Sequence, residues 1–158
     1  MRRFEVVSKE EFTKRLDEKY YANIKLPERK TGKSAGYDFS VCKGEVIKPV
    51  EVKVFPTGIK AKMDDGDFLA IFVRSSLGIK KGLMLANNVG IIDSDYYNNL
   101  DNEGHIMIAL INVSGKDVEI SDGERIAQGI FLKYEVVDGE KPRLCTGAGR
   151  DSRARTCT

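Results

Sequence analysis

Short apolar segments separated by polar turns limit most strongly what this chain can fold into. Apolar residues occupy every second position in 37–41, 50–54 and 59–63, with polar or charged residues between them. This period of two is typical of β-strands that bury one face. We therefore predict three half-buried strands in the first part of the chain.

Other segments are apolar almost throughout. Residues 68–73 carry only apolar side chains, and residues 105–113 are similar, while a further strand is expected at 126–134, with Ile126 and Gln128 on one side and Arg125 and Ala127 on the other. A run of this kind indicates a strand that is covered on both faces. Polar turns separate these segments at 64–67, 114–117 and 121–124. Many short strands joined by such turns predict an all-β fold, a sandwich or jelly roll.

One short helix is predicted near the beginning of the chain. Ser8 followed by Glu11 fits the capping box, in which a serine and a glutamate three residues later bind free backbone amides of the first helical turn. Phe12 and Leu16 lie four residues apart and would share one helix face. We predict a helix near residues 8–19.

The composition is that of an ordinary globular domain. The chain has 158 residues, of which 41% are hydrophobic and 32% charged, and this length suffices to bury a core. No apolar run approaches the roughly 20 residues that cross a bilayer, and the first residues do not lead into a secretory signal. We therefore expect a cytoplasmic protein with no membrane partner.

Charge is distributed unevenly along the chain. Five basic residues and Asp151 give residues 141–158 a charge of +4, which leaves −2 for residues 1–140 of a chain with net charge +2. The body therefore lacks the basic excess of a nucleic-acid binder. We predict a β domain at 1–140 and a mobile basic tail at 141–158, which either visits an anionic ligand or is a solvated end.

Cysteine and histidine residues are too few for a disulfide framework or a zinc site. The three cysteines, Cys42, Cys145 and Cys157, lack the Cys-x-x-Cys spacing, and His105 is the single histidine. A structural zinc ion needs four such ligands. Reduced thiols are the expectation.

An apolar segment stops abruptly at two carboxylates, Asp93 and Asp95. Ile91 and Ile92 would hold the preceding strand against a core, so Asp93 would emerge from packed structure. An aspartate held in this way can orient a water molecule and accept its proton. The alternative is a hairpin turn in which the carboxylates only bind backbone donors.

Arg74, Ser75 and Ser76 follow directly after the apolar segment 68–73. A guanidinium group, two hydroxyls and successive amides at a fixed strand end suit phosphate oxygens. The alternative is structural, with Arg74 paired to a carboxylate and the serines capping the next turn.

Four sequence motifs occur in a fixed order. They are Ser-Ala-Gly-Tyr-Asp-Phe at 34–39, Arg-Ser-Ser-Leu-Gly at 74–78, Asn-Asn-Val-Gly-Ile-Ile-Asp-Ser-Asp-Tyr at 87–96, and Gly-Glu-Arg-Ile-Ala-Gln at 123–128. Together they closely resemble four of the five motifs of the trimeric dUTP pyrophosphatase (dUTPase) family. The resemblance covers roughly residues 24–134.

The resemblance implies a β-clip jelly roll that assembles as a homotrimer with sites between subunits. It implies hydrolysis of dUTP to dUMP and pyrophosphate, which limits uracil incorporation into DNA and supplies dUMP for dTMP synthesis. Asp93 would activate the water, and Arg74, Ser75, Ser76 and Gln128 would contact the phosphates. The cofactor would be Mg²⁺, reached by Asp38 through water, because this ion keeps much of its hydration shell.

The same resemblance assigns a nucleoside site to the hairpin around 87–96. Its backbone would pair with the uracil edge and leave no room for the methyl group of thymine. Tyr96 would stack on the deoxyribose and block a ribose 2′-hydroxyl; the alternative for this residue is structural, an amphipathic ring at a turn. The nucleoside contacts would come from Asn87, Gly90, Ile91, Ile92, Asp93, Tyr96 and Met107. We expect the side chains of Ile91, Ile92 and Met107 to pack in the core.

Two departures from the family pattern stand out. Residues 97–103 intervene between Tyr96 and Gly104, where the family closes its hairpin sooner, so this hairpin end is enlarged and would carry extra surface contacts. The fifth motif, a glycine-rich lid with a phenylalanine, is absent, and residues 147–152 replace it without an aromatic ring. Loss of a lid weakens turnover more than recognition.

Two other functions remain open at this stage. A dCTP deaminase shares the fold but carries a glutamate on the strand after the Ile-Asp pair, where residues 105–113 contain no carboxylate. A non-catalytic nucleotide-binding trimer would act through partner contacts of the enlarged hairpin end, and the missing fifth motif motivates this alternative.

Overall fold

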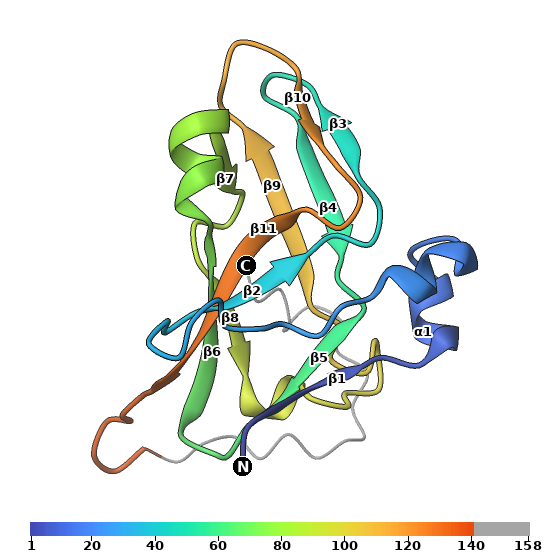
Figure 1. Cartoon of the computed structure of the whole chain (residues 1–158). Coiled ribbons are helices and arrows are strands. Elements are labelled where there is room, and N and C mark those ends of the chain that lie inside the picture. Colours follow the sequence, from blue (N-terminus) through green and yellow to red (C-terminus); the bar gives the residue numbers. More distant parts are fainter. Residues whose placement is uncertain (141–158) are drawn as a thin grey trace.

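The structure is a computed structural model that describes residues 1–140. It consists mostly of β-strands with few helices (Figure 1). The tail predicted at 141–158, with the replacement for the fifth motif, lies outside the described residues. Among the residues described, no helix is long and apolar enough to cross a membrane.

The largest sheet contains four antiparallel strands. In spatial order they are β2 (Tyr37–Ser40), β11 (Arg125–Lys133), β6 (Asp67–Val73) and β8 (Gly90–Asp93). The central strand β6 is covered on both faces as predicted, because the consecutive residues Leu69, Ala70 and Ile71 are all buried. Its neighbour β8 is an edge strand.

A second sheet has three antiparallel strands, β4 (Val52–Pro56), β9 (Met107–Asn112) and β7 (Leu83–Leu85). Two pairs of strands complete the fold (Figure 1). These pairs are β1 (Arg3–Val6) with β5 (Ile59–Lys62), and β3 (Glu45–Ile47) with β10 (Val118–Ile120).

One large apolar cluster joins these sheets. Its fully buried members come from several strands and include Ile47, Leu69, Leu83, Leu110 and Ile126. Burial of one such side chain contributes roughly 1.5–3 kcal/mol. Each sheet therefore depends on the others for its covered face.

The expected orientation of 50–54 is wrong. Val50 does not belong to the strand: it lies in a turn with φ of 63°, and the exposed side chains of Val52 and Val54 point away from the core. Phe55 is buried instead. The turn is fixed by the amide of Glu51, which donates to the carbonyl of Lys48 at 3.0 Å. Strand β4 therefore begins with Val52 and Val54 facing away from the core.

The predicted helix is shorter than 8–19. Helix α1 spans Lys9–Thr13, and a 3₁₀-helix, η1, follows at Glu18–Asn23. Ser8 caps α1 as predicted, since its hydroxyl accepts from the amide of Glu11 at 3.1 Å. The amide of Ser8 donates to Glu103 rather than to Glu11, at 3.0 Å. The Glu11 side chain instead points inward and is buried.

Cys42 is buried and forms no disulfide within the described residues. Burial raises the pKa of its thiol to about 11, so the group stays protonated near neutral pH. The cysteine is therefore a small core side chain here.

Asn112, which is completely buried at the end of β9, joins three segments. Its amide nitrogen donates to the carbonyls of Ile47 and Lys116, both at 2.8 Å. Its side-chain oxygen accepts from the amide and the hydroxyl of Ser114 at 2.8 and 2.7 Å. All hydrogen-bonding atoms of the side chain are used.

We predict that Asn112→Ala lowers the free energy of unfolding by about 2–4 kcal/mol, because buried backbone groups lose their partners. Asn23→Ala is the matched control: Asn23 donates one bond, to the carbonyl of Cys42 at 2.9 Å, and its loss should cost about 1 kcal/mol. Urea denaturation measures both. Equal losses for the two variants would contradict the special role of Asn112.

Candidate functional site

A cleft of about 450 Å³ lies between β8, the turn after it and β9. Seven of the residues predicted to contact the nucleoside line it, namely Asn87, Gly90, Ile91, Ile92, Asp93, Tyr96 and Met107. The structure therefore brings the predicted nucleoside residues together within one chain. A concave site with apolar walls and a few polar groups is typical of small-molecule binding.

Asp93 is the last residue of β8, placed opposite Phe68 of β6. It precedes the short 3₁₀-helix η3 (Ser94–Tyr96), but its side chain makes no capping hydrogen bond there. The alternative in which the Asp93 carboxylate serves only the turn is therefore not what the structure shows. Asp93 is partly exposed and lines the cleft.

The pKa of Asp93 is raised above that of an ordinary aspartate. Partial burial is the larger cause, and repulsion from the neighbouring Asp95 carboxylate is the second. Both disfavour the charged form. A carboxylate with a raised pKa is a stronger proton acceptor once it is ionised.

The apolar walls come from Ile91, Ile92 and Met107. Ile92 packs against the core as expected, and Met107 is half-buried. For Ile91 the expectation of core packing is wrong: its side chain is 44% exposed. Successive residues of a strand point to opposite faces, and with Ile92 inward, Ile91 and Asp93 point outward together.

The enlarged hairpin end adds cleft residues that sequence reasoning missed. Asn99, Asp101 and Asn102 line the cleft, and so does Asp95. The signal available in the sequence was the density of asparagine and aspartate directly after Tyr96. Such residues are typical of turns, and their composition alone did not distinguish a solvated turn from a cleft wall.

The remaining predicted residues do not line this cleft. Arg74, Ser75, Ser76, Gln128 and Asp38 form a second group around β2, β11 and the end of β6. Asp38 pairs with two guanidinium groups, with Arg74 Nε at 3.2 Å and with Arg125 Nη1 at 2.9 Å. The alternative in which Arg74 pairs with a carboxylate is therefore what the structure shows for this residue.

Ser75 and Ser76 stand between β6 and the π-helix η2 (Leu77–Lys81). Ser76 directly precedes η2, yet its hydroxyl makes no capping hydrogen bond. Its hydroxyl is therefore not used to cap this helix.

Gln128 lies opposite Asp38 on β2 and opposite Phe72 on β6. A β-carbon at Gly36 would lie 2.6 Å from the Gln128 side-chain oxygen, so Gly36 is needed for this close approach. Side chains do not alternate at the start of β11, because the register shifts between Arg125 and Ala127 and both Ile126 and Ala127 are buried.

The two groups lie far apart within one chain. Asp38 is on β2 and Asp93 on β8, the opposite edges of the four-stranded sheet. Three strand spacings and four residues along β6 separate them, about 14 Å in each direction, hence about 20 Å in all. One chain alone does not place both groups around the same phosphorus atom.

The described residues contain no group of three or more His, Cys, Asp or Glu side chains that would hold a metal ion. Both Asp38 oxygens already face guanidinium groups. The residues present therefore do not fit a metal site made by this chain alone.

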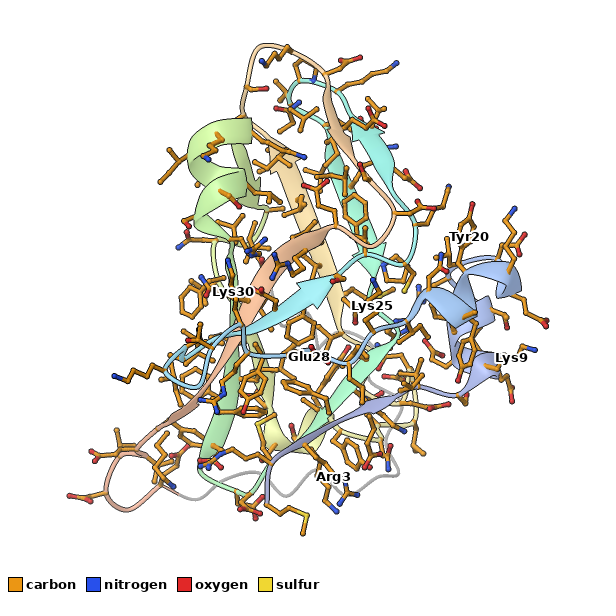
Figure 2. All side chains as sticks on the ribbon, in the orientation of Figure 1. Arg3, Lys9, Tyr20, Lys25, Glu28 and Lys30 are labelled. Atoms are coloured by element: carbon orange, nitrogen blue, oxygen red, sulfur yellow. The ribbon has the colours of Figure 1, made fainter. Side chains whose placement is uncertain are left out.

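A second cleft of about 500 Å³ borders Asp38 and Arg125. Lys25, Arg29 and Lys30 add positive charge to its lining. Figure 2 shows Lys25, Glu28 and Lys30 along the segment that leads from η1 to β2. Four basic and two acidic side chains line this cleft, and the positive excess favours an anion beside Arg125.

Comparisons with known proteins agree on one family. The family model described as dUTPase matches residues 22–149. The deoxyuridine 5′-triphosphate nucleotidohydrolase of Lactococcus lactis subsp. lactis is 47% identical over 120 residues, 76% of this chain and 80% of the relative. That of Psychromonas ingrahamii is 39% identical over 131 residues, 78% and 83% of the two chains.

Solved structures of the same kind share the fold. The crystal structure of dUTPase from Streptococcus mutans has a TM-score of 0.72 and 43% identity, covering 86% of this chain and 98% of that one. The dUTPase of Staphylococcus bacteriophage 80alpha, 19% identical with a TM-score of 0.68 over 90% and 96% of the two chains, shows the fold alone. The family match over most of the chain and the identity to these relatives show that the chain belongs to the dUTPase family.

Proposed function

We propose that the protein hydrolyses dUTP to dUMP and pyrophosphate. The observation that carries this proposal is the Asp93 carboxylate, which ends a strand fixed against the core and lines a cleft shared with the predicted nucleoside residues. Family membership supports the same reaction. The cytoplasmic location stays a prediction.

In the proposed reaction Asp93 accepts a proton from a water molecule that attacks the α-phosphorus. The new bond joins the water oxygen to this phosphorus, and the bond from it to the oxygen bridging the α- and β-phosphates breaks. The products are dUMP and pyrophosphate, which leaves with the electron pair of the broken bond. The chain's contribution is to position and activate the water and to stabilise charge on the phosphates.

We further propose that Arg74, Ser75, Ser76 and Gln128 bind the phosphates from a different copy of the chain. Asp38, which pairs with Arg74 and lies opposite Gln128, is about 20 Å from Asp93 by the strand spacings, and this separation supports a site built between subunits. In the jelly-roll homotrimer implied by the family, such a composite site would form three times.

An exposed apolar face supports this assembly. Val52, Ile111 and Met84 pair across β4, β9 and β7, and Val54 pairs with Ala109 in the next row. Val52, Val54 and Met84 are each about half exposed, at 50%, 56% and 45%. A contiguous apolar row on a sheet face typically marks a contact surface, and we assign it to copies of this chain.

We propose that Mg²⁺ arrives with the triphosphate and is held chiefly by its phosphate oxygens, where it supplies positive charge when bound. A contact from Asp38 would run through water, since Arg74 and Arg125 already occupy its two oxygens. The dUTPase of phage phi11 of S. aureus, a structural neighbour of this chain, coordinates a structural Mg(II) ion.

We predict that Asp93→Asn lowers kcat for dUTP at least about 100-fold, because the amide cannot accept the proton from water. Binding of dUTP should persist, since the shape of the cleft is kept. Pyrophosphate release measures the first quantity, and calorimetric titration with dUTP measures the second. A variant that releases pyrophosphate as fast as the parent would refute Asp93 as the base.

We predict that Asp95→Asn moves the acid limb of the kcat/KM profile to lower pH. The base works only when ionised, so the rate falls as pH drops through the raised pKa of Asp93. Removal of the Asp95 charge eliminates one of the two causes of that elevation. Asp101→Asn is the control and should leave the limb in place. An unchanged limb in Asp95→Asn would contradict the electrostatic coupling.

We predict that Val54→Lys converts the trimer to single chains, because burying an unpaired ammonium group in an apolar interface is unfavourable. Sedimentation velocity should give three chain masses for the parent and one for the variant, and dUTP turnover should fall with the assembly. Val6→Lys adds the same charge to the β1–β5 pair and should stay trimeric. A trimeric Val54→Lys protein would remove this face from the interface.

A further inference from the structure

The Tyr96 side chain and backbone are held by two asparagines of the enlarged hairpin end. The amide nitrogen of Asn102 donates to the Tyr96 hydroxyl at 2.7 Å. The amide nitrogen of Asn99 donates to the Tyr96 carbonyl at 2.8 Å. The two ends of this residue are therefore fixed by side chains that a shorter hairpin would lack.

The asparagines also fix each other. Asn99 Nδ2 donates to Asn102 Oδ1 at 2.9 Å, and Asn102 Oδ1 accepts from the amide of Gly104 at 3.0 Å. Because the Gly104 amide is only a donor, the oxygen of Asn102 must face it and the nitrogen must face Tyr96. Asn99 Oδ1 in turn accepts from the amides of Asp101 and Asn102.

The hydroxyl of Tyr96 has no hydrogen left to donate to a ligand in this arrangement. It accepts from Asn102 and donates to the carbonyl of His105 at 3.3 Å. His105 is itself immobile, because it is fully buried and its Nε2 accepts from the amide of Gly58 at 2.9 Å. The hydroxyl end of the Tyr96 ring is therefore held in place, and its hydrogen is already donated to the His105 carbonyl.

The hairpin end rests on the N-terminal segment. Glu103 accepts from the amide of Ser8 at 3.0 Å, and the Tyr97 hydroxyl donates to Glu5 of β1 at 2.6 Å. Lys60 of β5 donates to Asn98 at 2.7 Å. The extra surface contacts expected of this hairpin end are thus made within the chain. These contacts hold residues 97–103 against Ser8, β1 and β5.

We propose that Asn102 and Asn99 are positioning residues that hold Tyr96 in place, so that the cleft rejects ribonucleotides. This rests on the proposed function, in which Tyr96 lies against the deoxyribose. A fixed ring cannot move aside for a 2′-hydroxyl, and its own hydroxyl hydrogen is already bonded to the His105 carbonyl and is not available to that group. Steric overlap and the missing donor together disfavour a ribonucleotide.

The test is the ratio of kcat/KM for dUTP to that for UTP. Asn102→Ala should lower this ratio about tenfold or more, mainly through faster UTP turnover. Tyr96→Phe removes this hydrogen bond together with the one to the His105 carbonyl, and it should lower the ratio at least as much. The double variant should then lose little more than Tyr96→Phe alone, as expected for two residues that act through a shared contact.

Asn98→Gly is the matched control. Asn98 lies in the same hairpin end with φ of 56°, which glycine adopts without strain, and its side chain contacts Lys60 rather than Tyr96. The ratio of kcat/KM for dUTP to that for UTP in Asn98→Gly should equal that of the parent. An equal loss in Asn98→Gly would show a general loosening of the hairpin end and would overturn the proposal. An unchanged ratio in both Asn102→Ala and Tyr96→Phe would also overturn it.

Two further measurements keep the proposal separate from the proposed function. If the parent does not hydrolyse dUTP, the proposed function fails, and the positioning role is then read from the Kd of dUMP against that of UMP in the same variants. If Asn102→Ala does not fold in a thermal melt, Tyr96→Phe alone decides: a preserved preference for the deoxy form overturns the proposal, and a lowered preference supports it.

Discussion

The pairing of β8 with β6 determines where the cleft beside Asp93 lies. Leu69 lies opposite Ile92, and Ile71 lies opposite Gly90, so the edge strand is held by the most deeply buried part of the sheet. A shift of this register by one residue would turn Ile92 outward and Asp93 inward. The loss of apolar burial that such a shift entails keeps Asp93 on the cleft side. The position of the proposed base thus follows from the packing of its neighbours.

The two groups of site residues carry opposite charges. Asp93, Asp95 and Asp101 line the cleft beside β8, whereas Arg74 and Arg125 pair with Asp38 on β2, the opposite edge strand of the sheet. Three carboxylates repel a triphosphate unless cations accompany it. The proposed arrangement meets this requirement twice, with Arg74 from another copy and with the Mg²⁺ that travels with dUTP. Before any ligand binds, the Asp38 carboxylate holds the guanidinium groups of Arg74 and Arg125 close together.

Much of the fold and half of the site could be predicted from the sequence. The apolar segment 68–73 predicted the central strand, and the motif around Asp93 predicted a cleft that the structure assembles within one chain. The orientation of Val52 and Val54 could not be predicted, because alternation defines two faces without saying which is covered by the same chain. The shift between Arg125 and Ala127 also left no signal, since a bulge breaks the period of two without a characteristic residue here.

The hairpin end illustrates why the remainder depends on three-dimensional contacts. Asparagines in a turn have the same composition whether water or protein satisfies them, and only the distances from Asn99 and Asn102 to Tyr96 distinguish the two cases. The same network reaches helix α1 through His105, whose Nδ1 lies 3.5 Å from the buried Glu11 carboxylate. Burial lowers the pKa of His105, which keeps the ring neutral near pH 7 and lets Nε2 go on accepting from the amide of Gly58. The first helix therefore contributes to the geometry of a nucleoside cleft that it does not touch.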